Sequence, residues 1–220
     1  MTEVRVRPYR EDDRAAVRNV CCDTGYMGEP ADWFWRDRES FADLFSGYYT
    51  ENEPHRASVV QVDGAVSGYL LGCVGGSATR ASAAAFTRHI VLRGVAFRRG
   101  TAGVIWRTIG DSVFDAIKGR TKPRDLEFDD PRYPAHLHID LLPIARGHGA
   151  GRQLVNVWLD RLRSESISGC YLQTMAENTN AIAFFEAVGF RRHGDVHLVP
   201  GFRTRTRQRH HLLTMVVDLS

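Results

Sequence analysis

The chain has 220 residues, of which 43% are hydrophobic and 25% charged, and its formal net charge is +3. This length and composition suit a folded domain with a buried core, and we expect residues 1–220 to form a single domain. No apolar run approaches the roughly 20 residues that span a bilayer, and the N-terminus lacks the apolar core of a signal peptide, so we expect a cytoplasmic protein with no membrane partner. The charge is too small to favour nucleic acid as a partner.

The four cysteines, Cys21, Cys22, Cys73 and Cys170, match no motif for metal binding or redox chemistry. None stands in a CxxC pair, and adjacent cysteines such as the first two rarely bridge each other. We therefore expect reduced, mostly buried thiols and no metal site.

The first third of the chain predicts two helices and three strands. The two longer strands flank Asp63–Gly64, a pair that suits a tight hairpin turn, and the first helix ends at Gly25. The predicted elements are a strand at 4–8, helices at 11–25 and 37–49, and strands at 57–62 and 65–74.

Residues 75–135 differ in composition and predict a helical insertion. Two helical patterns, at 81–100 and 101–120, meet at a short break at Gly100. An insertion of this size favours a role in substrate choice or in the contact of a homodimer, whereas apolar residues at helical spacing favour simple packing. We interpret most of them as packing residues, namely Ile90, Val91, Val95, Ile105, Trp106, Ile109, Val113 and Phe114.

The remaining third alternates strands and helices. The last predicted helix begins at Asn178, a residue type preferred at the N-cap, and ends at Gly189. The predicted elements are a strand at 136–142, helices at 152–164 and 178–190, and strands at 169–175, 196–201 and 209–219. Taken together, the order predicts a mixed α/β sheet domain.

The stretch IARGHGAGRQL, residues 144–154, joins an apolar strand to an amphipathic helix. Glycines before a helix let the backbone approach a ligand, and the unpaired N–H groups of the helix N-terminus attract anions. Its G-x-G-x-G spacing matches neither a Walker P-loop nor a dinucleotide-binding fingerprint. We therefore predict a pyrophosphate cradle to which Arg146 and Arg152 add charge; a tight loop that needs glycine for its turn is the alternative.

Two linked motifs resemble those of the GNAT family, the acyl-coenzyme A-dependent N-acetyltransferases. The first, Arg-x-x-Gly-x-Gly, is matched by Arg146, Gly149 and Gly151. The second, Asn-x-x-Ala-x-x-x-Tyr-x-x-x-Gly-Phe, is matched in outline by a set that has phenylalanine in place of the tyrosine: Asn178, Ala181, Phe185, Gly189 and Phe190. Within the family, YPAHLHIDLLP and the HGD and VPG segments look like bacterial relatives of the acetyltransferase-like region of O-GlcNAc hydrolases.

The resemblance implies a mixed, mostly antiparallel, twisted sheet flanked by helices, with the helical insertion before the central strand. It also implies transfer of an acetyl group from acetyl-CoA, the co-substrate, to an amine-bearing acceptor that attacks the thioester directly. A backbone N–H near Leu141 and Leu142 would stabilise the oxyanion. The implied cofactor-binding residues are Leu141, Leu142, Ile144, Arg146, Gly147, His148, Gly149, Ala150, Gly151, Arg152, Asn178, Asn180, Phe184 and Phe185.

The apolar strand carries three polar residues on one face, because His136, His138 and Asp140 alternate with apolar neighbours. A buried strand is normally apolar on both faces, so this face lines a cavity or a hydrogen-bonded network. We favour Asp140 or His138 as the group that takes the amine proton, and a merely structural Asp–His pair is the alternative.

The family's usual general acid, a tyrosine, is replaced here by Phe184 and Phe185, which have no proton to donate. Tyr133, Tyr171 or a water is a candidate substitute, with Tyr133 our first choice. The missing acid also leaves open a module that binds acetyl-CoA and catalyses little.

Two stretches are candidate walls of the acceptor site. One contains Trp33, Phe34 and Trp35 with nearby carboxylates, and its aromatic rings suit a cationic amine or a sugar, although aromatic residues of this kind often belong to a core. The other, RTRTRQRHH at 203–211, can attract an anionic substrate, although such a run is often a solvated hairpin loop.

Overall fold

A computed structural model describes residues 2–75, 84–85, 87–89, 91–120 and 126–219. Its strands are β1 (Val4–Pro8), β2 (Ala57–Val62), β3 (Ala65–Val74), β4 (Ala135–Leu141), β5 (Gly169–Met175), β6 (Arg191–Arg203) and β7 (Arg209–Asp218). Its α-helices are α1 (Arg14–Thr24), α2 (Arg38–Ala42), α3 (Tyr48–Asn52), α5 (Ala102–Ile117), α6 (Ala150–Ser164) and α7 (Thr179–Ala187). Most predicted elements are confirmed, with boundaries shifted by a few residues.

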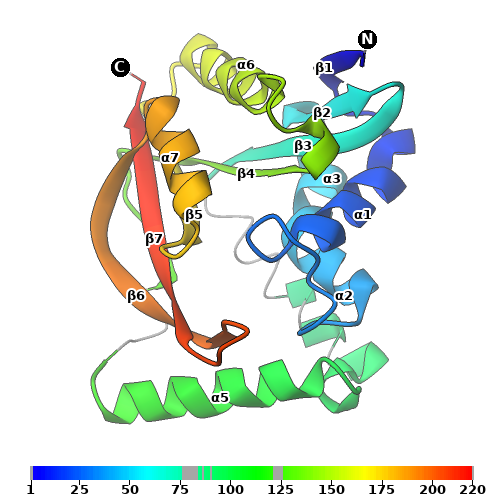
Figure 1. Cartoon of the computed structure of the whole chain (residues 1–220). Coiled ribbons are helices and arrows are strands. Elements are labelled where there is room, and N and C mark those ends of the chain that lie inside the picture. Colours follow the sequence, from blue (N-terminus) through cyan, green and yellow to red (C-terminus); the bar gives the residue numbers. More distant parts are fainter. Residues whose placement is uncertain (1, 76–83, 86, 90, 121–125, 220) are drawn as a thin grey trace.

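The seven strands form one sheet in the order β1-β2-β3-β4-β5-β7-β6. Every neighbouring pair is antiparallel except β4 and β5, which are parallel. These two strands pair only where Ala135 faces Cys170 and His136 faces Tyr171, so the sheet opens beyond that point. The predicted mixed, mostly antiparallel sheet flanked by helices is confirmed (Figure 1).

Each face of the sheet is covered by a different set of helices. Helices α6 and α7 pack against one face and include the buried Trp158, whose ring lies so close to Gly72 that a Cβ there would be 2.5 Å from it. The other face is covered by the N-terminal helices, and its core contains Tyr69 and Leu71 from β3. Strand β4 contributes to both faces, because Leu137 joins the first core while His136, His138 and Asp140 lie opposite in register with Cys73, Leu71 and Tyr69.

The predicted helix at 101–120 is confirmed by α5, which lies across the far ends of β6 and β7 and packs against β6 (Figure 1). At this contact Gly201 has φ 76° and leaves room for Thr108 of α5. The preceding helical pattern is described only in part, and its described residues are helical at 84–85, 87–89 and 91–93, with Gly94 at φ 58° ending them. The break between the two helical segments runs over 94–101 and includes Gly100, which has φ 87°.

The interpretation of the apolar residues in the insertion as packing residues holds for Val95 and Ile105, which are buried. It is wrong for five others, which are exposed: Val91, Trp106, Ile109, Val113 and Phe114. Ile90 lies outside the described residues. The reason is that α5 has the sheet on one side only, and helical spacing of apolar residues does not reveal how many faces a helix buries.

No α-helix in the described parts of the chain is long and apolar enough to cross a membrane.

Candidate functional site

The site begins at the gap between β4 and β5. At the end of β4, the Leu142 N–H donates to Ser67 O of the neighbouring chain segment at 2.8 Å. Because backbone groups of successive strand residues point in opposite directions, the Leu141 N–H points toward the gap. Of the two residues expected to supply an oxyanion donor, Leu142 uses its N–H within the sheet and Leu141 has its N–H directed to the opening.

The glycine-rich loop leads from this gap into α6. Gly147 and Gly149 adopt left-handed backbone with φ 79° and 76°, and Gly149 is the N-cap of α6 without a side-chain cap. Helix α6 starts at Ala150, two residues earlier than predicted. As at the start of any α-helix, the N–H groups of its first turn have no intrahelical acceptor. A Cβ on Gly151 would lie 3.1 Å from Leu141 and 3.2 Å from Phe184, so this helix start fits tightly between β4 and α7.

The two arginines of the loop have structural partners. Arg146 donates to Leu141 O at 2.9 Å and to Gly28 O at 2.7 Å, which ties the loop to the segment after α1. Arg152 donates to Ala187 O at 3.1 Å, at the end of α7. Their positive charge stays near the α6 N-terminus while their N–H groups hold its surroundings in place. Half of the predicted set is exposed, namely Ile144, Arg146, Gly147, His148, Gly149, Arg152 and Asn180.

Helix α7 forms the other side of the loop. Asn178 caps it, with its Oδ1 accepting from Ala181 N at 3.2 Å. Phe185 is buried against Phe190 and belongs to the core beneath α6, whereas Phe184 reaches the α6 N-terminus. The position expected to hold the general acid is therefore filled by a core side chain.

Asp140 and His138 lie together on the face of β4 that is turned away from α6 and α7. His138 Nε2 lies 2.9 Å from Asp140 Oδ2, and the buried Tyr69 hydroxyl donates to the same oxygen at 2.6 Å. Burial, with the nearby Asp140 charge, holds the pKa of Tyr69 well above its usual value, so the hydroxyl remains a donor. The side chains of Asp140 and His138 are 17% and 27% exposed, so the pair remains accessible at its outer side.

The third polar residue of this strand face, His136, is engaged differently. Its Nδ1 is hydrogen-bonded to the buried Tyr49 hydroxyl of α3, with 2.9 Å between the two atoms. Burial, with a smaller effect of His138, lowers the pKa of His136 to about 3, so its imidazole is neutral at physiological pH. His136 thus has a structural partner of its own, apart from the pair formed by Asp140 and His138.

The candidate proton donors Tyr133 and Tyr171 lie toward the other end of β4 and β5. The Tyr133 hydroxyl donates to Asp218 Oδ1 at 3.0 Å and accepts from Arg191 at 2.7 Å. Tyr171 packs against His136, and burial raises the pKa of its hydroxyl to about 12. The structure does not bring Tyr133 together with Asp140 and His138.

A second polar chain, which the sequence did not reveal, links three segments near the gap. The Tyr26 hydroxyl lies 3.1 Å from His210 Nε2, and His210 Nδ1 lies 3.0 Å from Glu177 Oε2. Burial opposes ionisation of Glu177, yet hydrogen bonds from His211 and His210 lower its pKa to about 2. The ionised Glu177 carboxylate accepts from the Nδ1–H of His210, so Tyr26, His210 and Glu177 form one hydrogen-bonded chain.

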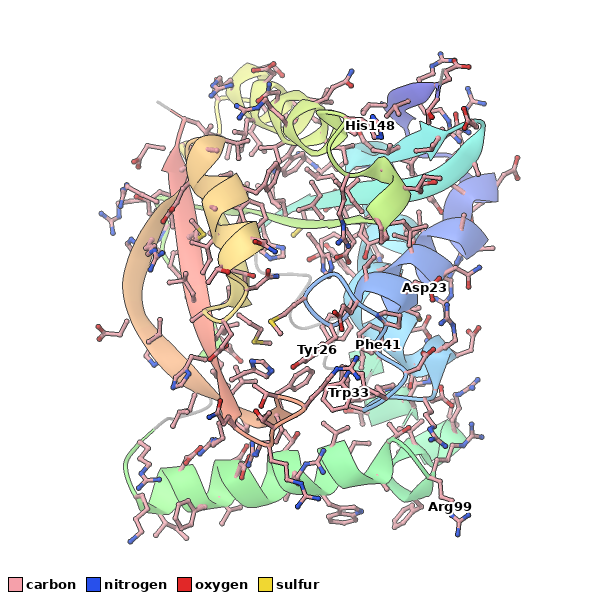
Figure 2. All side chains as sticks on the ribbon, viewed as in Figure 1. Asp23, Tyr26, Trp33, Phe41, Arg99 and His148 are labelled. Carbon is pink, nitrogen blue, oxygen red and sulfur yellow. The ribbon has the colours of Figure 1, made fainter. Side chains whose placement is uncertain are left out.

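The aromatic stretch after α1 is divided between core and surface. Phe34 and Trp35 are buried, as the core alternative predicted, whereas Trp33 is 38% exposed. The Trp33 ring packs edge-on against Tyr26 with 4.9 Å between ring centroids, and Figure 2 shows the two side by side. Trp33 and Tyr26 therefore form one aromatic surface beside His210. Among the described residues, no group of three or more histidine, cysteine, aspartate or glutamate side chains is placed to hold a metal ion.

Comparison with known proteins agrees with this geometry. Residues 121–190 match the model of the Acetyltransferase (GNAT) family. Over 99% of both chains, the fold is similar to that of SsHAT, with 27% identity and a TM-score of 0.71. It is also similar to yncA of Salmonella typhimurium, solved with its cofactor acetyl-CoA, at 15% identity over 99% of this chain and 94% of that one, with a TM-score of 0.56.

A third similar structure is the ribosomal-protein-S18-alanine N-acetyltransferase of Escherichia coli, at 14% identity, 99% and 95% coverage and a TM-score of 0.54. The chain thus has the fold of GNAT acetyltransferases along its length, and the family model covers the part that carries the glycine-rich loop and α7. The predicted fold and the general class of acyltransferase are supported together.

Proposed function

We propose that the protein is an acetyl-CoA-dependent N-acetyltransferase that transfers the acetyl group directly to a primary amine. One observation carries the proposal: the uncapped, glycine-led N-terminus of α6 lies at the mouth of the gap between β4 and β5. The N–H groups of its first turn suit the pyrophosphate of acetyl-CoA, and the gap gives the pantetheine arm a path along β4.

Leu141 and the Asp140–His138 pair have separate roles in this proposal. The Leu141 N–H stabilises the oxyanion that forms when the amine attacks the thioester carbonyl. Asp140 attracts the protonated amine and, with His138, takes its proton before attack, while Tyr69 holds the carboxylate in position. Coenzyme A is a fair leaving group, so the thiolate can depart without a tyrosine at the Phe185 position.

A catalytically weak module that binds acetyl-CoA is the second candidate, and the burial of Phe185 in the core favours it. We also propose the narrower relationship to the acetyltransferase-like region of O-GlcNAc hydrolases, on the segments around β4 and β6, and a cytoplasmic location. Turnover of acetyl-CoA that depends on an added amine distinguishes the enzyme from the binding module.

Free coenzyme A release tests the proposal. Acetyl-CoA is mixed with the protein and a panel of amines that includes amino sugars, polyamines and lysine peptides. We expect thiol release that depends on one class of amine, with the acetylated amine detected by mass spectrometry. Binding of acetyl-CoA without amine-dependent release would favour the binding module instead.

A further inference from the structure

We propose that a cavity between α5, the segment after α1 and the β6–β7 turn binds an oxyanion, a phosphate or carboxylate, carried by the small-molecule amine that accepts the acetyl group. This inference rests on the proposed acetyl transfer for the identity of its ligand. The cavity has a volume of ≈ 600 Å³, which suits a small molecule.

Four arginines line this cavity, which makes it strongly cationic. They are Arg107 from α5 and three from the turn region of the last hairpin, Arg203, Arg205 and Arg207. The guanidinium groups stay charged at any physiological pH, and their planar N–H forks match phosphate and carboxylate oxygens. The run 203–211, singled out in the sequence, is thus brought against a helix more than 80 residues away.

Two of these charges have carboxylate partners and two do not. Arg203 is paired with Asp111 at 2.6 Å, and Arg205 with Glu29 at 3.2 Å while its guanidinium lies 5.3 Å from the Trp33 ring centre. Across the described parts of the chain, no carboxylate forms an ion pair with Arg107 or Arg207. The cavity therefore keeps about two positive charges for a ligand.

Backbone geometry adds an independent observation. Arg207 has φ 66°, a left-handed conformation that glycine or asparagine adopts more readily. The Arg207 N–H donates to Thr204 O at 2.9 Å, which closes the turn. The closed turn holds Arg207 beside Arg205 in the cavity lining.

A continuous row of aromatic rings links the cavity to the proposed reaction site. Phe34 in the cavity wall lies 6.2 Å from Phe41, and Phe41 lies 4.7 Å from Phe45, between ring centroids. Phe45 in turn lies 6.2 Å from His138. Phe34 and Phe41 are buried in the core, so these rings place the cavity and the Asp140–His138 pair on the same side of the sheet, joined through packed core side chains.

This arrangement favours an acceptor with two opposite charges. Its ammonium group would lie near the Asp140 carboxylate and its oxyanion near the arginines. A like-charged or neutral acceptor would leave the unpaired arginines without a partner. The charges therefore select amines that carry a phosphate or a carboxylate.

Binding of matched ligands by the full chain tests the proposal by calorimetry at low salt. In each pair one member carries the anion: glucosamine 6-phosphate is compared with glucosamine, and β-alanine with β-alanine amide. Phosphate and carboxylate are thus tested separately. We expect the anionic member of at least one pair to bind about tenfold or more tightly. The double variant Arg107→Gln/Arg207→Gln should lose this preference.

Arg99→Gln is the control, because Arg99 is exposed at the outer edge of the molecule, outside the cavity lining (Figure 2). Equal binding within both pairs, or a preference that survives the double variant, would overturn the proposal. An arginine-dependent preference for the anion without acetylation of any of these ligands would confirm the cavity as an oxyanion site but contradict its assignment to the acceptor; the wider amine panel tests acetyl transfer separately.

Discussion

Asp140 is held by two neighbours and still reaches the surface. Tyr69 donates to its carboxylate from the buried side, and His138 contacts the same oxygen. A purely structural pair would need no exposure, whereas 17% of the Asp140 side chain and 27% of that of His138 remain exposed. This exposure agrees with the proposed role of the pair in removing a proton from the acceptor.

Asp140→Asn should lower kcat about 100-fold and leave acetyl-CoA affinity unchanged, because the amide keeps the shape but is a very poor base. Steady-state thiol release and calorimetry measure the two quantities. Asp160→Asn is the control, since Asp160 is exposed on α6 and forms its ion pair with Arg163. An unaltered kcat for Asp140→Asn would contradict the role given to this carboxylate.

His136 makes the fold sensitive to acid. Its folded pKa of about 3 lies below the ordinary value of 6.5, so the unfolded chain binds the proton more readily. This contribution to stability is present above pH 6.5 and is lost as the pH falls toward 3. Between pH 7.5 and pH 5 the wild type should lose about 2 kcal/mol more unfolding free energy than His136→Gln.

Urea unfolding of both proteins at the two pH values measures this difference. Parallel losses in wild type and His136→Gln would show that the imidazole is not held neutral in the fold.

At the residue scale, the alternation of the strand sequence correctly placed His136, His138 and Asp140 on one face. It could not reveal Tyr69, which lies 71 positions from Asp140, nor Tyr26, which meets His210 across 184 positions. Those partners depend on which strands are neighbours, and that order is not contained in the local pattern. The spacing also could not show that Tyr133 bonds to Asp218.

Among the elements, α5 shows that the helical spacing of apolar residues predicts a helix but not which of its faces are buried. The sequence predicted a helix over 101–120, and α5 spans Ala102–Ile117. One face packs against β6, whereas Trp106, Ile109 and Val113 are exposed on the other. We propose that this apolar face forms the contact of a homodimer, since large exposed apolar patches commonly mark interaction sites.

Ile109→Glu should shift the protein toward monomer without unfolding it, because an exposed side chain contributes little to the core. Sedimentation velocity at several concentrations measures the shift, and circular dichroism monitors the fold. Gln208→Glu is a control that adds the same charge at an exposed position on the β6–β7 turn. A wild type that sediments as a monomer at all concentrations would contradict this proposal.

At the scale of the molecule, the fold brings the glycine-rich loop, the gap in the sheet and the Asp140–His138 pair together around β4. The two motifs at 146–151 and 178–190 predicted the fold because they are local patterns tied to a strand–helix corner and a helix cap. The sequence indicated that the run 203–211 can attract an anion, but it could not show that α5 completes an arginine-lined cavity with this run. Loop, gap and pair together form the proposed acetyl-transfer site.

Calorimetric titration of acetyl-CoA into wild type, Gly149→Asp and Gly64→Asp tests that site most directly. Both glycines are left-handed, with φ 76° and 84°, and a Cβ at either would meet nothing within 4 Å, so the two variants impose similar backbone strain. Only Gly149→Asp places a carboxylate at the α6 N-terminus, where the pyrophosphate is proposed to bind. We predict that it weakens acetyl-CoA binding at least about tenfold while Gly64→Asp binds as the wild type does; equal affinity in folded Gly149→Asp, or no binding by the wild type, would contradict the account.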